Sequence, residues 1–267
     1  MTYAIMPTES YQTLCDKLRE KTGGTDELVA SDIPGIIKQF TSDKILKSYI
    51  AGTLTSYSND RITKVGDYAF YNCSKLVDVY FPNVIEVGEY AFQGSKITKV
   101  TSENFPNLTT LNQHSFRSCG SLTYVNLPKV EVITGYAFNT SSYIKEAQFD
   151  NATSTGNRAF VTNSRLEKVI LPKMQSIYGL TFYQCYSLKA VILSSETVCS
   201  LLNADAFNQC YHILGTVNST WNKNGDKDGY IYVPRALIED YKIATNWSTY
   251  AEQFRAIEDY PEICGDV

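Results

Sequence analysis

The strongest constraint on the fold is an internal repeat that runs through the middle of the chain. Seven copies of a motif ending in Ala-Phe, or a close variant of it, have their phenylalanines at Phe70, Phe92, Phe116, Phe138, Phe160, Phe182 and Phe207. These phenylalanines are separated by 22, 24, 22, 22, 22 and 25 residues. So regular a spacing predicts a solenoid, in which each repeat is stable only when it is stacked on its neighbours.

A small residue stands three positions after each phenylalanine. These residues are Cys73, Ser95, Cys119, Ser141, Asn163, Cys185 and Cys210. Because cysteine shares this position with serine and asparagine, we interpret the column as a structural ladder of small, weakly polar side chains. Cys185 and Cys210 stand in adjacent copies, but their side chains should run parallel, so free thiols are expected. No C-x-x-C spacing or partner histidine supports a metal site.

An apolar trio with the spacing L-x-x-V-x-L follows, as in Leu122, Val125 and Leu127. This spacing predicts a short strand whose alternate side chains point into the solenoid. A proline such as Pro128 often ends the run, because proline cannot donate to the next ladder bond. Glycines such as Gly135 precede the next copy, where they are expected to supply positive φ or a close backbone approach.

Side chains between the inward positions should form a continuous outward surface on the strands. We expect this binding face to comprise Asp78, Tyr80, Lys99, Tyr124, Asn126, Glu146, Gln148, Lys168 and Ile170. Solenoids use such faces to bind partners, and tyrosine is enriched at interfaces. The alternative is that any solenoid exposes residues of this kind without using them.

The repeat resembles the BspA-type leucine-rich repeat family, whose units read approximately I-x-x-I-G-x-x-A-F-x-x-C-x-x-L-x-x-I-x-L-P. The resemblance covers about residues 62–213 and implies an α/β fold, a right-handed leucine-rich-repeat β-solenoid of six to seven repeats of 22–25 residues. It also implies a recognition or adhesion module at a bacterial cell surface. The copy at 141–150 departs most, with Ala147 in place of valine and no proline, so an irregular sheet is expected there.

The residues in front of the repeats have a different character. Residues 1–44 are expected to form a small helical module that includes an amphipathic helix at 11–21, whereas capping strands and repeats fill 45–215. Residues 18–37 resemble a short module at the front of tail-associated and repeat proteins of gut Firmicutes and their prophages. This resemblance implies a second setting, a phage or prophage tail component.

Residues 216–267 are expected to cap the C-terminal end of the repeats with a strand at 230–233, a helix at 236–243 and a last helix at 249–257. Trp247 is expected to plug the core of the final repeat. The segment 224–229 resembles the start of a calcium loop, but Arg235 stands where a bidentate glutamate is needed. A polar turn is therefore the preferred interpretation.

Composition and motifs argue against several functions. With 24 basic and 28 acidic side chains the net charge is −4, which disfavours binding to nucleic acid. No apolar run approaches the ~18 residues of a membrane span. With only His114 and His212 as histidines, and with none of the common catalytic or nucleotide-binding motifs, neither an enzyme nor a bound cofactor is expected.

The expected partner is therefore a protein or a glycan. The expected location is the cell surface or a phage particle, although the start MTYAIMPTES lacks the features of a secretion signal.

Overall fold

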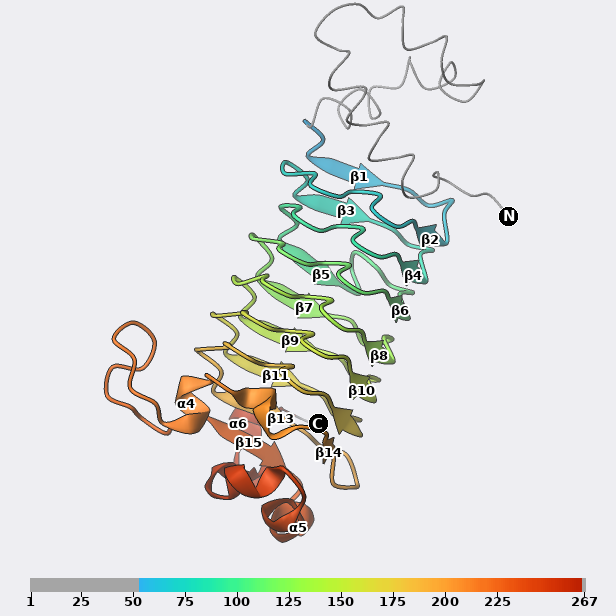
Figure 1. Cartoon of the computed structure of the whole chain (residues 1–267). Helices are drawn as coiled ribbons and strands as arrows, with labels where there is room; N and C mark the ends of the chain where they lie inside the picture. Colours follow the sequence, from blue (N-terminus) through green and yellow to red (C-terminus); the bar gives the residue numbers. More distant parts are fainter. Residues whose placement is uncertain (1–52, 266–267) are drawn as a thin grey trace, which may run out of the picture.

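The computed structural model describes residues 53–265 as an elongated stack of coils (Figure 1). Each coil contributes a three-residue strand, a two-residue strand and a turn that carries the Ala-Phe motif. All strand pairs within the sheets are parallel and join equivalent residues of neighbouring coils. The predicted α/β solenoid is thus confirmed. The helical module expected at residues 1–44 lies outside the described residues.

The three-residue strands form one wall of the solenoid, which we call the strand wall. Its strands within the coils are β1 (Ser56–Ser58), β3 (Asp78–Tyr80), β5 (Lys99–Thr101), β7 (Tyr124–Asn126), β9 (Glu146–Gln148), β11 (Lys168–Ile170) and β13 (Ala190–Ile192). From β5 onward they form a seven-stranded sheet with β15 (Tyr230–Val233) and β16 (Phe254–Ala256), whereas β1 and β3 form a two-stranded sheet.

A second seven-stranded sheet, which the repeat pattern did not predict, forms another side of the solenoid. Its strands are β2 (Lys64–Val65), β4 (Glu86–Val87), β6 (Thr110–Leu111), β8 (Val132–Ile133), β10 (Ser154–Thr155), β12 (Ser176–Ile177) and β14 (Ser200–Leu201). The second residue of each strand is buried in the core. A two-residue strand is too short to display the alternation by which strands are recognised in a sequence.

Turns that carry the Ala-Phe motif close the third side. Their backbones are also bonded from coil to coil, since the N–H of Phe92 donates to Ser115 O at 2.8 Å and that of Phe116 to Ala137 O at 2.8 Å. In six of the seven copies the residue two positions before the phenylalanine takes the left-handed conformation, as at Tyr90 with φ 55°; Asp205 is the exception. Gly88 does not take this conformation; a Cβ there would lie 2.4 Å from Asp67 Oδ1, so this glycine serves close approach.

A column of stacked phenylalanine rings fills the core, as the repeat predicts. From Phe70 to Phe207 the seven side chains are at most 4% exposed. Adjacent rings lie nearly parallel, for example Phe92 on Phe116 with centroids 5.1 Å apart and planes at 3°. Each ring therefore buries its face against the equivalent ring of the next coil, so the apolar core is continuous along the solenoid axis.

The irregularity expected at residues 141–150 is absent, because β9 pairs in register with both β7 and β11. The interruption lies instead between β3 and β5, which are not joined in one sheet. The spacing of that copy explains it: Ile97 follows Ser95 by two residues, whereas Leu122 follows Cys119 by three. A missing residue before the strand shifts the strand relative to its neighbour.

The C-terminal residues close the stack partly as expected. The last coil ends with the 3-10 helix η1 (Ala204–Phe207), and the α-helix α4 (Tyr211–Leu214) follows it. Strand β15 comes next, followed by the 3-10 helix η2 (Arg235–Leu237) and the α-helix α5 (Ile238–Ile243). These elements match the strand and the first helix predicted there. The last helix, predicted at 249–257, forms only in its first part, as a 3-10 helix that ends at Gln253. The chain forms η3 (Trp247–Gln253) and then β16, which pairs with the open edge of β15.

Trp247 plugs the end of the core, which confirms its expected position. Its side chain is 0% exposed and its ring lies 5.9 Å from that of Phe207. Its indole Nε1 donates to Cys199 O at 2.5 Å, so the buried donor is satisfied. Two short elements, η4 (Ile257–Asp259) and α6 (Pro261–Cys264), end the described chain.

Replacing a ring in the middle of the phenylalanine column should destabilise the solenoid. Phe138 is fully buried between Phe116 and Phe160, so we expect Phe138→Ala to lower the free energy of unfolding by about 3–5 kcal/mol. Guanidinium unfolding measures the loss. Tyr178→Ala is the control, because that side chain is 47% exposed and should cost under about 0.5 kcal/mol. Equal losses in the two variants would contradict a continuous core.

Candidate functional site

Two columns of side chains run along the outer face of the strand wall. Because neighbouring strands pair residue by residue, equivalent positions lie side by side at the ~4.8 Å spacing of a sheet. One column is Lys99, Tyr124, Glu146 and Lys168. The other column is Thr101, Asn126, Gln148 and Ile170, of which Thr101 is only 6% exposed. Asp78 and Tyr80 are the outward positions of β3, which belongs to a separate sheet, so the structure aligns the expected residues from β5 to β11 and places those of β3 beyond the break.

The exposure of this face falls toward the C-terminal end. Tyr80 is 49% exposed, and Asp78 and Lys99 are exposed as well. In the middle of the wall the expected residues are half-buried; they are Tyr124, Asn126, Glu146, Gln148 and Lys168. The N-terminal and central part of the face therefore remains accessible to a partner.

The expectation that Ile170 belongs to the accessible face is wrong, because its side chain is only 6% exposed. Ile170 and Ile192 belong to a second apolar cluster on the outer side of the wall, together with Tyr232 and Cys264. Tyr260 and Ile263 pack against that cluster. The C-terminal segment thus covers the last part of the outer face, and Ile170 cannot contact a partner there.

Charges on the accessible face alternate in sign and its amides are partly engaged. Along one column Lys99, Glu146 and Lys168 carry opposite charges in turn. Asn126 Nδ2 donates to Tyr124 OH at 3.3 Å, and Gln148 Nε2 donates to Asp150 Oδ1 at 2.8 Å. Such a surface offers hydrogen bonds and aromatic contact without a strong field of one sign.

The column of small residues behind the turns forms hydrogen bonds from one coil to the preceding one. Five of these side chains donate to the backbone carbonyl of the phenylalanine in the preceding coil. The pairs are Cys119 to Phe92 at 3.2 Å, Ser141 to Phe116 at 2.7 Å, Asn163 to Phe138 at 2.9 Å, Cys185 to Phe160 at 3.2 Å and Cys210 to Phe182 at 3.1 Å. Ser95 is buried and lies 3.5 Å from Cys119 Sγ, whereas Cys73 is half-buried. These contacts are those of a structural ladder.

Burial makes the ladder thiols poor nucleophiles. It raises the pKa of the Cys119 thiol from the ordinary 9.0 to about 12, and it raises the pKa values of Cys185 and Cys210 as well. Since the thiolate is the reactive form, these side chains are inert at neutral pH. Cys185 and Cys210 are free thiols in the structure.

The raised pKa of Cys119 predicts a fall in stability at alkaline pH. Below about pH 9 the thiol is protonated in both states, but above it the unfolded chain loses the proton that the folded chain keeps. Each such thiol should cost about 1.4 kcal/mol per pH unit up to its folded pKa. Urea unfolding between about pH 9 and 11 should therefore show a shallower decline for Cys119→Ser than for the wild type. Identical slopes would contradict the effect.

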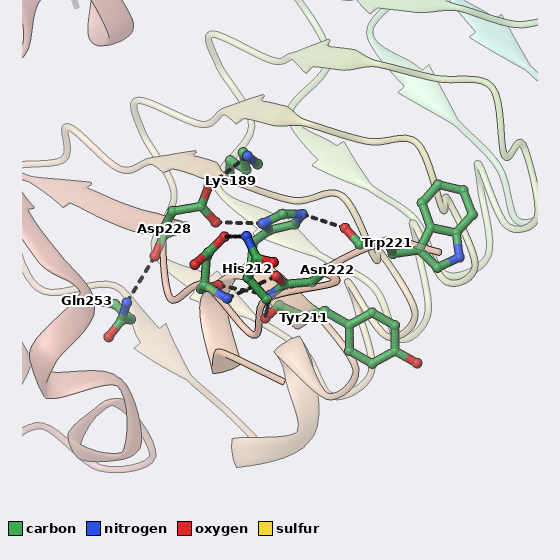
Figure 2. A network of polar contacts seen from close by, with 10 residues as sticks. Lys189, Tyr211, His212, Trp221, Asn222, Asp228 and Gln253 are labelled. Atoms are coloured by element: carbon green, nitrogen blue, oxygen red, sulfur yellow. Dashed lines mark hydrogen bonds and ion pairs between the residues drawn. The ribbon is translucent and has the colours of Figure 1, made fainter. Parts of the chain in front are cut away.

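A polar network holds the segment between α4 and β15 against the last coils (Figure 2). His212 lies between two acceptors, Asp228 Oδ1 at 2.5 Å from Nδ1 and Trp221 O at 2.9 Å from Nε2. Lys189 Nζ contacts Asp228 Oδ2 at 2.7 Å. Burial alone would raise the pKa of the Asp228 carboxyl, but hydrogen bonds from Lys189 and His212 outweigh it and lower that pKa.

Asn222 organises the same segment from inside. It is 3% exposed, and its Nδ2 donates to Tyr211 O at 3.0 Å and to Asp226 O at 2.8 Å. Its Oδ1 accepts from the N–H of Asp226 at 2.9 Å. Between residues 53 and 265, no group of three or more His, Cys, Asp or Glu side chains could hold a metal ion.

The sequence analysis missed an aromatic cluster beside this network. The rings of Tyr186 and Tyr211 stack with centroids 4.9 Å apart and planes at 6°. The Trp221 ring lies 5.5 Å from that of Tyr186. The available signal was weak: both tyrosines directly follow a ladder cysteine, Cys185 or Cys210. Nothing in the repeat indicates that Trp221 returns to them.

A protein-family model described as a BspA type leucine rich repeat region matches the chain in six copies, over residues 53–161 and 109–222. These stretches cover more than half of the chain. The chain belongs to this family. A search of the curated proteins gave no significant match. None of the helices within the described range is long and apolar enough to cross a bilayer.

Several solved structures of leucine-rich repeat proteins are similar to this chain. One is a leucine rich cell surface protein from Faecalibacterium prausnitzii, with 17% identity over 83% of this chain and 65% of that one and a TM-score of 0.38. A T. pallidum leucine rich repeat protein has 23% identity over 50% and 78%, with a TM-score of 0.40. A Bacteroides ovatus protein has 18% identity over 60% and 66%, with a TM-score of 0.33. The chain spans just under two thirds of the Faecalibacterium protein.

Removing the buried amide of Asn222 should loosen the segment that it organises. Asn222→Ala deletes the hydrogen bonds to Tyr211 and Asp226. The free energy of local opening at residues 215–229 should therefore fall by about 1–3 kcal/mol, and amide hydrogen exchange there should become faster. The stacked coils should keep their protection. Asn224→Ala is the matched control, since that side chain is exposed and makes one contact at 3.3 Å with Asp226. Unchanged exchange in Asn222→Ala would contradict its role.

Proposed function

We propose that this protein is a non-enzymatic recognition module that binds a protein or glycan partner of the bacterial cell-surface setting. The observation that carries the proposal is the accessible outer face of the strand wall between β3 and β11. From β5 to β11, side chains of successive coils lie side by side in two columns; β3 belongs to a separate sheet, and the C-terminal segment covers the far end of the same face. Flat, continuous surfaces of this kind are how solenoids engage partners.

Tyr80 and Tyr124 are the proposed anchors of this face. Tyrosine combines a large apolar ring with a hydroxyl, so it contributes contact area at low conformational cost. The surrounding groups alternate between Asp78, Lys99 and Glu146, which favours a partner with a mixed or neutral surface. The same mixture disfavours nucleic acid, which needs a basic surface, and gives no apolar patch for membrane insertion.

The environment of the titratable groups supports a non-enzymatic role. His114 is stacked between Tyr90 and Tyr136, with ring centroids at 4.4 Å and 4.7 Å, and burial lowers its pKa. His212 holds the polar network of the C-terminal segment. The ladder thiols are buried and protonated. These groups act in packing, and we propose neither a catalytic residue nor a cofactor.

The resemblance of residues 18–37 to modules of tail-associated proteins favours a second candidate, a phage or prophage tail component that binds a receptor. The two settings differ in what the face should bind. An adhesin should bind host matrix, whereas a tail component should bind bacterial cells. The genes beside the coding sequence also distinguish them, because a tail component should stand among other tail genes.

Binding of the purified full chain to whole gut-bacterial cells and to mammalian matrix proteins tests the proposal. For either partner, we expect Tyr80→Ala combined with Tyr124→Ala to weaken binding by about tenfold or more, since each buried ring at an interface is worth over about 1 kcal/mol. Tyr178→Ala is the matched control on the other side of the solenoid, where 47% of the side chain is exposed. Retained binding in the double variant would remove the strand wall as the site.

A further inference from the structure

The aromatic cluster of Tyr186, Tyr211 and Trp221 is built by a departure from the repeat. After Cys210 the chain leaves the coil pattern, forms α4 and an extended segment, and returns at β15. This segment brings the Trp221 ring to 5.5 Å from that of Tyr186, on a coil that precedes it. In Figure 2 the Trp221 and Tyr211 rings extend away from the hydrogen-bonded network that fixes their backbones.

The two tryptophans have different environments, which indicate different roles. Trp247 is fully buried and its Nε1 donates to Cys199 O, as a packing tryptophan should. Trp221 is half-buried, and within residues 53–265 its indole Nε1 forms no hydrogen bond. A large ring that keeps an unpaired donor at the surface contributes little to the core, but it offers a flat apolar face with a polar edge.

The segment is held rigidly enough to position that ring. His212 bonds to the Trp221 carbonyl at 2.9 Å, and the Trp221 N–H donates to Asn218 Oδ1 at 3.1 Å. Asn222, next in the chain, is buried with three hydrogen bonds. A preorganised aromatic ring loses little conformational entropy when a ligand binds to it.

The two coils that carry Tyr186 and Tyr211 also carry neutral hydrogen-bonding side chains. Gln184 and Gln209 stand two residues before Tyr186 and Tyr211, and Gln184 Nε2 donates to Gln209 Oε1 at 3.1 Å. Gln209 Nε2 in turn donates to Tyr183 OH at 3.2 Å. These side chains are half-buried, and each amide retains further donor and acceptor capacity.

The charged groups of the polar network that holds the segment are already paired with each other. Lys189 and Asp228 are paired at 2.7 Å, and Asp228 also binds His212. The stacked tyrosines are 4.9 Å apart, which leaves no slot between them for a prolyl ring. What remains is a half-buried aromatic cluster on coils that also carry neutral amides and hydroxyls. This combination matches a sugar ring, whose axial C–H groups form an apolar face and whose equatorial hydroxyls form hydrogen bonds.

We infer that the cluster of Tyr186, Tyr211 and Trp221 is a binding site for a neutral pyranose chain with equatorial hydroxyls. One ring of the saccharide stacks on Trp221, and its hydroxyls bond to Gln184, Gln209 and the indole N–H. The site is separate from the strand wall and does not depend on the function proposed for that face.

Cellohexaose, xylohexaose and laminarihexaose are the probes, and the full chain is titrated with each while tryptophan fluorescence is followed. We expect at least one of them to shift the emission of the wild type to the blue with saturation below about 1 mM. Calorimetry with the same saccharide should show binding weakened by about tenfold or more in Trp221→Ala and by less in Trp221→Phe, which keeps the stack. No saturable binding of any of the three would overturn the inference.

Further variants separate the site from the fold and from the other proposal. Gln209→Ala removes an amide and its two hydrogen bonds but no ring, and it should weaken saccharide binding while the protein stays folded at the temperature of the titration. Tyr178→Ala, and the Tyr80→Ala and Tyr124→Ala double variant, should bind the saccharide as the wild type does. Loss of saccharide binding in the strand-wall double variant, or saturable binding of decaproline in place of the saccharides, would also overturn the inference.

Discussion

Every other feature of the structure depends on the pairing of each residue with its equivalent in the next coil. Parallel strands and turn backbones are bonded in register, so a side chain faces its own counterpart at the spacing of a sheet. A buried position must then accept a column of similar groups. Phenylalanines satisfy this by stacking, and the small polar residues satisfy it by donating to the preceding carbonyl. The sequence repeat is the consequence of this self-stacking.

The same constraint explains where the chain departs from the pattern. A stack of identical coils has an open end, and closing it requires residues that do not repeat. Trp247 covers the last ring of the phenylalanine column, and β16 pairs with the edge of β15. The residues beyond β16 then fold onto the outer side of the wall, where Cys264 packs with Ile192. The C-terminal cap therefore sets how much of the wall a partner can reach.

Sequence reasoning succeeded where a property repeats and failed where it depends on a distant partner. The coil positions, the ladder and the plug at Trp247 follow from columns or from an apolar residue at an open end. The helix expected at 249–257 ends at Gln253, because residues 254–256 pair with the edge of β15 instead. Ile170 was expected at the accessible surface, since strand alternation cannot reveal that it joins an apolar cluster with Cys264. Trp221 was missed because tertiary contacts alone return it to Tyr186.

Specificity in such a molecule can lie only where stacking leaves the sequence free. In the strand wall the inward position keeps one character from coil to coil, as in Val125 and Val169, because the core demands it. The outward neighbour varies from Tyr124 to Lys168, because changing a solvated side chain has little effect on folding stability. The segment between α4 and β15 that carries Trp221 does not follow the coil geometry, so its sequence is still less constrained by stacking. Recognition should therefore be encoded in the residues that the repeat does not predict.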